Sequence, residues 1–409
     1  MKEKTLALKG LKVVELGTHV VVPTAARIMA DCGADVIKIE NLEGEEWRFI
    51  GKNNGLPVED SENALFTNRN SNKKFTALDL KTKSGKEAIL KFIAEADVFI
   101  TNVRLKALSK MGLDYESIKK KFPRLIYGHF TGFGYEGPDR DRPGFDMAAF
   151  WARSGALADW ANRGEFPSKP IGAFGDGAAA NFILTGILMA LFAREKNGKG
   201  SLVSTSLFGS AIWLSSLGII TAQEPYNTPY PASRYKPAVP LSHIYECKDH
   251  NFIIMTVLDY ERKRDSTLKL LGMDEYINDP RFDTLKHTKE NLEEFTRIVN
   301  KVFMTKTRDE WAEIFNKNGI VYEKLMHYRE IVKDPQALAN RYLEEVSFPS
   351  GTTIKMPRYP VVFSEYEVKD ISPTGSIGRD TKTALAKAGY TDREIQDMVA
   401  EKAVVVGKT

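Results

Sequence analysis

Short runs rich in β-branched residues alternate with helical patterns over the first 130 residues, and this alternation limits the fold more than any other feature. Two neighbouring strands can run parallel only if a long crossover, usually a helix, joins them. The alternation therefore predicts an α/β fold with a large Rossmann-like parallel-sheet domain. The expected strands are residues 11–16, 35–40, 98–101 and 125–130, with helices such as 24–32 and 83–96 between them.

The loop after the first expected strand lacks the glycine fingerprint of dinucleotide-binding folds. Residues 17–23 contain no G-x-G-x-x-G, the pattern with which those folds cradle a pyrophosphate. A nucleotide, if bound, is therefore not held by the usual glycine loop. Residues 131–144 combine glycines, prolines and charges, which is typical of a surface loop able to line a site.

The length of 409 residues and one proline-rich stretch indicate two domains. Residues 224–240 contain five prolines and no strand or helix period, so we expect a linker there. The N-terminal part of the large α/β domain is then residues 1–223, and a smaller α+β domain covers residues 241–330. We expect residues 331–409 to return and pack on the large domain.

Charge and cysteine content exclude several classes of protein. The 58 basic and 54 acidic residues leave a net charge of +4, and lysine clusters such as 119–121 are interleaved with acids and apolar positions, so a nucleic-acid track is not indicated. The two cysteines, Cys32 and Cys247, lie far apart without a CxxC or a histidine at ligand spacing. We therefore expect a cytoplasmic protein in a reducing compartment, with no metal site.

Two uncharged stretches raise the question of a membrane. Residues 177–193 are too short for a comfortable span, and residues 201–223 contain many serines and threonines. Helices packed inside the protein are the better interpretation of both. The N-terminus has no apolar core of a signal peptide, so secretion is not indicated either.

Asp176 is the strongest candidate for chemistry, because it lies between Gly175 and Gly177 at the start of the uncharged run 177–193. The run predicts a helix buried all round, with Asp176 at or beside its N-cap. Partial positive charge at the helix end would hold the carboxylate ionised, and the glycines would leave room for a substrate carbonyl. These features suit a nucleophile; a plain structural cap is the alternative.

Six short motifs occur in order along nearly the whole chain: residues 8–16, 33–40, 72–81, 96–102, 175–177 and 198–200. With these motifs the chain resembles the class III CoA-transferases, a family that includes formyl-CoA transferases, carnitine CoA-transferases and the 2-hydroxyacyl-CoA transferases of amino-acid-fermenting anaerobes. Residues 101–108 and 143–150 look most like the 2-hydroxyisocaproate and phenyllactate enzymes.

This resemblance implies a covalent mechanism at Asp176. The carboxylate attacks the thioester carbonyl of an acyl-CoA to give a mixed anhydride, which the released CoA thiolate converts into an aspartyl-CoA thioester. The acceptor acid, expected to be an (R)-2-hydroxy acid such as 2-hydroxyisocaproate, then repeats the sequence in reverse. Coenzyme A thioesters are substrates, no other cofactor is implied, and the family resemblance also implies an interlocked homodimer.

The resemblance also implies contacts to coenzyme A. The lysines and arginines among the positions that the resemblance assigns to coenzyme A can neutralise its phosphates, although solvated surface is the alternative for each of them. Asn102 can bond a backbone or pantetheine amide, whereas the apolar members can supply only walls or main-chain bonds. Asn41 and Val21 depart from the family pattern, which often has Arg and Gln there. The positions carried over are Val21, Val22, Asn41, Leu78, Lys81, Asn102, Val103, Arg104, Lys110, Arg142, Phe145 and Asp146.

A second departure concerns a loop of the small domain. Residues 234–242 contain no glycine, whereas formyl-CoA transferases carry a glycine run there, so a flexible lid of that type is not expected. Phe145, Phe150, Trp151 and Trp160 would suit a roomier apolar pocket. Ordinary core is the alternative, and we favour it for Trp151 and Trp160.

Two other functions remain open from the sequence. An acyl-CoA racemase of the same superfamily needs a histidine where this chain has Phe145, so His19 or His129 would have to serve as the base. His129 lies in an expected strand and is the better candidate for a core histidine. A non-catalytic CoA-binding protein on the same scaffold is the third possibility.

Overall fold

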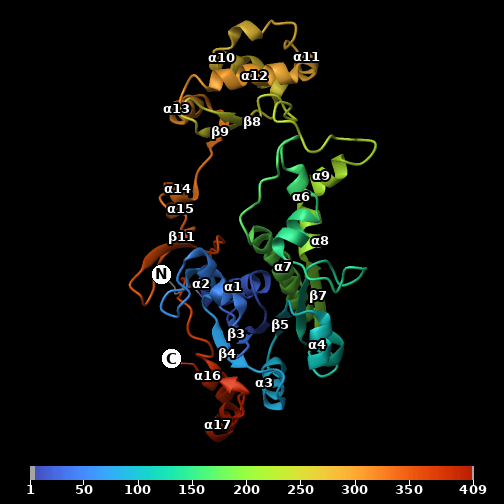
Figure 1. Cartoon of the computed structure of the whole chain (residues 1–409), viewed down its shortest axis with the longest axis vertical. Helices are drawn as coiled ribbons and strands as arrows, with labels where there is room; N and C mark the ends of the chain where they lie inside the picture. Colours follow the sequence, from blue (N-terminus) through green and yellow to red (C-terminus); the bar gives the residue numbers. More distant parts are fainter. Residues whose placement is uncertain (1–4, 408–409) are drawn as a thin grey trace. The chain divides into compact units, whose positions relative to one another are not determined.

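The computed structural model describes residues 5–407, and the chain divides into two compact units (Figure 1). Unit 1 takes in the chain up to Ala156, then Pro170–Ile219, then the chain from Pro335 onward. Unit 2 consists of Leu157–Lys169 and Ile220–Asp334, and so includes the proline-rich stretch 224–240. The division into domains with a linker at 224–240 stays a prediction.

Unit 1 is built on a seven-stranded sheet with the order β14-β4-β3-β2-β5-β6-β7. All neighbours are parallel except β14, which pairs antiparallel with β4. The predicted parallel α/β core is thus confirmed, including its four expected strands. The strands are β2 (Lys12–Leu16), β3 (Asp35–Glu40), β4 (Lys74–Leu78), β5 (Val98–Thr101), β6 (Ile126–Thr131), β7 (Ser201–Ser206) and β14 (Val404–Val405).

The strand order places a topological switch point between β2 and β5. From β2 the chain winds outward to β3 and β4, then returns to β5 on the other side of β2 and continues to β6 and β7. This is the order of the doubly wound nucleotide-binding folds, in which ligands bind outside the carboxyl ends of the strands near the reversal. The loops after β2 and β5 are therefore where a ligand is expected.

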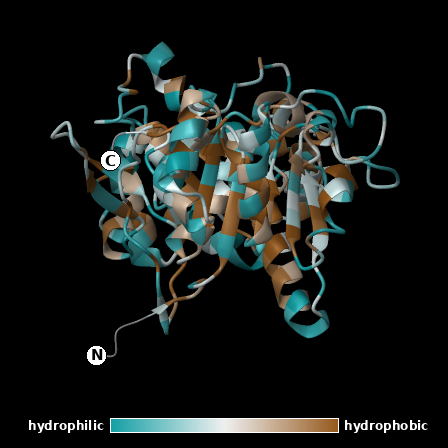
Figure 2. Cartoon of the chain, turned by 90° about the horizontal axis from the view of Figure 1, so that it is seen from below, coloured by the Kyte–Doolittle hydropathy of each residue, from teal (hydrophilic) through white to brown (hydrophobic). Residues whose placement is uncertain are grey.

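Helices cover both faces of this sheet. Val14 and Phe99 share one core cluster with Ile89 of α3 and Leu385 of α16. On β6, Tyr127 belongs to the same cluster, whereas the neighbouring Gly128 lies against Ile187 of α7, so α7 lies on the opposite face. Figure 2 shows the apolar colour on strands at the centre of this sheet.

The remaining elements of unit 1 are helical or short. Two segments, η1 (Glu46–Asn54) and η2 (Asp146–Ala152), are a 3₁₀-helix and a π-helix. The pair β1 (Thr5–Leu6) and β13 (Tyr366–Glu367) is parallel, and β11 (Leu343–Ser347) and β12 (Thr353–Pro357) form a hairpin. The helices are α1 (Val21–Asp31), α2 (Ala64–Asn70), α3 (Lys83–Ala94), α4 (Leu105–Met111), α5 (Tyr115–Ile118), α7 (Phe174–Asn197), α8 (Leu207–Leu214), α15 (Pro335–Ala339), α16 (Thr381–Lys387) and α17 (Asp392–Ala400).

The prediction that the helix after Asp176 is buried all round is wrong. Helix α7 has 24 residues and buries one face, with Ile183 and Ile187 fully covered, while Met189 and Phe192 are 67% and 66% exposed. Within residues 5–407, α7 is also long and apolar enough to cross a membrane by length and composition. The lack of charged residues indicates that the helix surface is apolar, but it does not show what covers that surface.

The prediction of a packed helix over residues 201–223 is also wrong. The segment starts with β7, because its alternating, β-branched sequence completes the sheet, and it continues as α8 and the short α9 (Ser216–Thr221). Trp213 and Leu217 are 72% and 76% exposed. Unit 1 thus presents apolar surface on α7, α8 and α9.

Unit 2 has its own small sheet and core. Its strands β8 (His243–Glu246), β9 (Phe252–Thr256) and β10 (Val321–Lys324) form an antiparallel sheet. Tyr245 stacks on Phe303 with ring centroids 4.1 Å apart, and Trp311 and Phe315 complete this aromatic cluster. A 3₁₀ turn, η3, covers Asp274–Tyr276, and α6 (Ala156–Asp159) starts in unit 1 and ends in unit 2. The helices of unit 2 are α10 (Tyr260–Leu270), α11 (Leu285–Glu290), α12 (Leu292–Phe303), α13 (Arg308–Asn318) and α14 (Tyr328–Ile331).

Candidate active site

Asp176 is the third residue of α7 and does not cap it. The helix begins at Phe174, after Ala173 in the left-handed conformation (φ 67°), and no side chain of the N-cap residue caps it. The cap comes from a distant carboxylate instead. Asp146 accepts hydrogen bonds from the backbone N–H of Ala173 (3.0 Å) and of Asp176 (3.1 Å). The predicted N-cap role of Asp176 is therefore wrong, and its carboxylate is left free for chemistry.

The glycines on either side of Asp176 differ in what they allow. A Cβ at Gly175 would lie 2.3 Å from Oδ1 of Asp146 and 2.5 Å from the ring of Phe150, so α7 can approach η2 only with glycine there. A Cβ at Gly177 would meet nothing within 4 Å. Gly175 is thus needed for packing, and the side of Gly177 is open to an approaching group.

The environment of Asp176 disfavours its ionised form. Burial, followed by the charge of Asp146, raises the pKa of Asp176 to about 7, and Arg69 counteracts this only in part. Burial also raises the pKa of Asp146, against the backbone N–H groups that it accepts. The helix end therefore does not keep the pKa of Asp176 low, because Asp146 already accepts the N–H groups of Ala173 and Asp176 and adds a like charge.

Asn102 fixes the two loops of the switch point to each other. Its Oδ1 accepts from the backbone N–H of Thr18 (3.0 Å), and its Nδ2 donates to the carbonyl of Thr18 (2.9 Å). The loop after β2 is thereby tied to the loop after β5. The side-chain amide of Asn102, which the sequence analysis considered for a bond to pantetheine, thus bonds the backbone of Thr18. Asn102 therefore positions the loop after β2.

A buried charge network lies under the loop after β2. The Nζ of Lys38 contacts Glu15 (2.9 Å), Glu45 (2.8 Å) and the carbonyl of Gly17 (2.8 Å), while the Nζ of Lys73 contacts Glu15 at 2.7 Å. Burial lowers the pKa of Lys73 to about 8, although Glu15 opposes this. Sequence reasoning missed the network, since its members are scattered over three strands and their loops; the signal was charged residues within otherwise apolar strands.

Arg69 is a further residue that sequence reasoning missed. It lies in the last turn of α2, half-buried, and its Nη1 donates to Oγ1 of Thr24 in α1 at 3.4 Å. Its charge favours the ionised form of Asp176. The only sequence signal was its place three residues before the 72–81 motif. Together these residues form a site with a carboxylate, a nearby cation and an open approach.

Comparison with known proteins shows the family to which the chain belongs. A model described as CoA-transferase family III matches residues 8–381. The chain belongs to CoA-transferase family III. The predicted family is thus confirmed, and with it the class of enzyme.

Several relatives match this family III chain along its length. It is 35% identical over 399 residues to an (R)-2-hydroxy-4-methylpentanoate CoA-transferase of Clostridioides difficile, with 98% of this chain and 100% of the relative covered. It is 34% identical over 410 residues to a cinnamoyl-CoA:phenyllactate CoA-transferase of Clostridium sporogenes, with 100% of both chains covered. A crystal structure of a CAIB/BAIF family protein from Brucella suis matches with a TM-score of 0.82 and 27% identity, over 94% of this chain and 100% of that one.

The apolar members of the predicted coenzyme set are mostly buried. Val21 and Val22 are the first residues of α1 and are 5% and 0% exposed, and Leu78 ends β4 at 1% exposed. Their side chains therefore belong to the core of the family III fold, which leaves only their backbone for a ligand. Val103 follows β5 and is half-buried, and its carbonyl contacts Nε2 of His129 at 2.9 Å.

The cationic members are exposed. Lys81, Arg104 and Lys110 have no carboxylate within 4.0 Å among residues 5–407. Arg142 lies 3.8 Å from Asp139 and over the ring of Phe133. The fold thus leaves these three cations exposed and without an ion pair among the described residues, and their contact with phosphates stays a prediction.

Asn41, directly after β3, is also exposed, but its side chain accepts from the backbone N–H of Glu43 (3.0 Å) and forms a turn. The positions that follow β2, β3, β4 and β5 all lie at the carboxyl edge of the parallel sheet, because successive strands point the same way. The fold therefore brings most of the predicted set to one edge. Lys110 lies apart from the strand ends, in the last turn of α4.

The aromatic residues divide between core and surface. Phe145 is 61% exposed and stands edge-on to His19, with ring centroids 5.3 Å apart. Trp151 is 4% exposed, which confirms its core assignment. Trp160 is 68% exposed, so its core assignment is wrong; it lies in the short excursion 157–169 of unit 2. His129 is 1% exposed and bonded to backbone, as expected of a core histidine.

Within the described part of the chain no group of three or more His, Cys, Asp or Glu residues could hold a metal ion. Both cysteines are free and buried, and burial raises the pKa of each thiol to about 11. Burial therefore disfavours the thiolate, the reactive form, of both cysteines.

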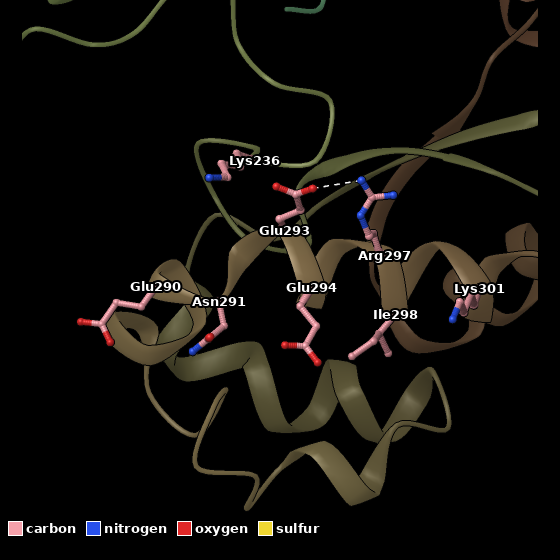
Figure 3. A pocket seen from close by; sticks show the side chains of 8 residues that line it. All are labelled: Lys236, Glu290, Asn291, Glu293, Glu294, Arg297, Ile298 and Lys301. Carbon is pink, nitrogen blue, oxygen red and sulfur yellow. Dashed lines mark hydrogen bonds and ion pairs between the residues drawn. The ribbon is translucent and has the colours of Figure 1, made fainter.

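Unit 2 of the family III chain carries a groove of about 590 Å³ on α12 (Figure 3). Charged side chains of both signs line it, and Glu293 and Arg297 form an ion pair of 2.9 Å there. It contains none of the predicted site residues and no nucleophile. We assign it no role in the reaction.

Proposed function

We propose that this protein transfers coenzyme A from an acyl-CoA donor to a free carboxylic acid of the 2-hydroxy acid class, with Asp176 as the nucleophile. The observation that carries the proposal is that the carboxylate of Asp176, in the first turn of α7, does not cap the helix. The backbone N–H of Asp176 donates to Asp146 instead. The names of the relatives support the substrate class, since they print (R)-2-hydroxy-4-methylpentanoate and phenyllactate.

The proposed chemistry needs four bond exchanges. A carboxylate oxygen of Asp176 attacks the thioester carbonyl, the C–S bond breaks, and CoA thiolate leaves. The thiolate then attacks the aspartyl carbonyl of the anhydride, releasing the donor acid and leaving Asp176 as a CoA thioester. The acceptor carboxylate attacks that thioester, and the thiolate finally attacks the acceptor acyl carbonyl, which restores Asp176. No electron or external proton is consumed, so the cycle needs no redox cofactor.

The perturbed pKa suits this role. A pKa of about 7 leaves a substantial fraction of Asp176 ionised at neutral pH. An ionised carboxylate that burial has partly stripped of water is a stronger nucleophile than one fully solvated. Asp146 contributes by fixing the first turn of α7 and by destabilising the resting carboxylate.

We propose that coenzyme A binds at the carboxyl edge of the sheet. Lys81, Arg104 and Lys110 would neutralise its phosphates, and the backbone N–H groups at the start of α1 would contribute partial positive charge. Phe145, exposed at the end of the loop 131–144, would offer an apolar wall to the acyl chain.

We also propose a homodimer, interlocked as the family resemblance implies, and a cytoplasmic location. The apolar surface of α7, α8 and α9 supports the dimer, because exposed clusters such as Met189, Phe192, Trp213 and Leu217 are typical of a surface that a partner covers. Sedimentation of the purified protein at micromolar concentration should give a dimer; a monomer at all concentrations would contradict this part of the proposal.

An exchange assay tests the function. Labelled CoA should move from an acyl-CoA to a 2-hydroxy acid with wild-type protein, and Asp176→Ala and Asp176→Asn should lose this activity while remaining folded. Asp392→Asn, which changes an exposed acid in the first turn of α17, is the matched control and should keep it. Tight CoA binding without exchange would favour a non-catalytic protein.

A racemase is the second candidate, because His19 stands edge-on to Phe145, the position at which a racemase of this superfamily needs its histidine. Its discriminating readout is exchange of the α-proton of an acyl-CoA with solvent deuterium. A transferase should show CoA exchange without deuterium uptake.

A further inference from the structure

Arg69 differs from the other shielded arginines of unit 1 in having no carboxylate partner. Arg27 pairs with Asp31 at 3.1 Å, and Arg48 pairs with Glu40 at 2.7 Å. No carboxylate of residues 5–407 lies within 4.0 Å of Arg69. Cations shielded from water are nearly always paired, because desolvation without a counter-charge is costly.

The hydrogen bonds of Arg69 are also incomplete. Its Nη1 donates to the hydroxyl of Thr24 at 3.4 Å, which is long, and its Nε is buried without a partner among the described residues. The guanidinium group has five donors in a planar fork that matches a carboxylate. Arg69 therefore has donors to offer that the described chain does not use.

Arg69 is placed beside the nucleophile. Thr24 lies in the first turn of α1, and α1 packs against both α2, which carries Arg69, and α7, which carries Asp176. The two charges attract each other, yet Arg69 and Asp176 form no ion pair within 4.0 Å. Both side chains keep some exposed surface. The lack of a direct ion pair leaves both charged groups available to a third group.

We propose that Arg69 binds the carboxylate of the free acid and holds it next to Asp176. This inference rests on the proposed function and names the residue that selects its acid substrate. Arg69 would contact the donor acid as it leaves and the acceptor acid as it binds, because both react at the side-chain carbonyl of Asp176.

The contact fits the bond changes. An oxygen of the acid held by Arg69 attacks the carbonyl carbon of the Asp176 thioester, and the C–S bond breaks as CoA thiolate departs. The negative charge of the acid is consumed in the anhydride and reappears on the thiolate. When the thiolate attacks the acyl carbonyl, the C–O bond breaks and Asp176 recovers its charge beside Arg69. No other reactant is needed.

Steady-state kinetics with Arg69→Gln and Arg69→Lys test this inference. Arg69→Gln should raise the KM for the acceptor acid roughly tenfold to a hundredfold, the usual cost of a charged hydrogen bond. The KM for acyl-CoA should change much less. Arg69→Lys should recover part of the loss, because it keeps the charge without the fork. Arg393→Gln, on the exposed face of α17, is the matched control and should leave both constants unchanged.

A second readout separates substrate binding from a structural role. Removing the positive charge should move the acidic limb of the pH profile to higher pH, because Arg69 favours ionised Asp176. If Arg69 acts through its charge, the acidic limb shifts in Arg69→Gln and returns in Arg69→Lys. A purely structural role would not produce this pattern. An unchanged KM for the acid in a folded Arg69→Gln protein overturns the inference, as does an equal loss for both substrates.

Trapping of the Asp176 adduct with an acyl-CoA distinguishes a failure of the Arg69 inference from a failure of the proposed function. If wild-type protein and Arg69→Gln both form the Asp176 adduct but their acid KM values agree, the inference about Arg69 fails and the proposed function stands. If wild-type protein forms no adduct, both fail.

Discussion

Replacing Asp176 by Asn should stabilise the protein above neutral pH. Burial and the charge of Asp146 raise the pKa of Asp176 from 3.8 to about 7, so the folded protein bears a cost whenever this carboxyl is ionised. Asn has nearly the same size and carries no charge. It therefore removes the cost and leaves the packing of α7 against η2 in place.

The magnitude follows from the pKa. A change from 3.8 to about 7 corresponds to about 4 kcal/mol, and partial exposure reduces the expected gain to roughly 2–4 kcal/mol. An acid in the first turn of a helix normally stabilises it by about 0.3–1 kcal/mol, and the substitution loses this. Burial therefore outweighs the helix dipole, and the net effect is a gain.

The sign depends on pH. The folded state holds the proton of Asp176 more tightly than the unfolded state, so the cost is absent at low pH, grows between about pH 4 and pH 7, and is complete above that. Calorimetric unfolding of wild type and variant from pH 5 to pH 8.5 should show midpoints that diverge as pH rises. Asp392→Asn should show no such gain. A variant less stable than wild type at pH 8, or a difference independent of pH, would refute the reasoning.

The same geometry leads to three further predictions. The kcat/KM for acyl-CoA should rise with pH through a midpoint of about 7, since only ionised Asp176 attacks, and a midpoint below pH 5 would contradict the environment described. Gly175→Ala should lower stability by roughly 1–3 kcal/mol, while Gly177→Ala should not, as measured by urea unfolding; equal effects would be inconsistent with the packing. Lys73→Met should cost roughly 3–5 kcal/mol because it leaves Glu15 with one partner, and a smaller loss than at an exposed lysine would show that the network is not needed.

The sequence predicted the parts of the fold in which local pattern and tertiary role agree. The strands β2, β3, β5 and β6 carry enough apolar and β-branched residues to be recognised from their own residues. Strands β4 and β7 were missed because KFTAL and SLVSTS are short and partly polar, and only their neighbours in the sheet make them strands. Pairing of this kind is a tertiary effect.

The site was predictable in its centre but not in its surroundings. Asp176 stood out through its flanking glycines, and resemblance located most of the edge of the sheet. The cap from Asp146, the cation at Arg69 and the raised pKa arise from residues far apart in the chain. For the same reason the exposed side of α7 was misjudged: composition shows that a helix is apolar, but not which surfaces meet it.

Trapping of the enzyme intermediate tests the role of Asp176 most directly. The protein is mixed with an acyl-CoA, quenched with hydroxylamine or borohydride, digested, and analysed by mass spectrometry. A modification on the peptide that contains Asp176, absent in Asp176→Asn and present in Asp392→Asn, is the predicted result. An unmodified Asp176 in protein that is turning over, or a modification on another residue, would contradict covalent catalysis at this carboxylate.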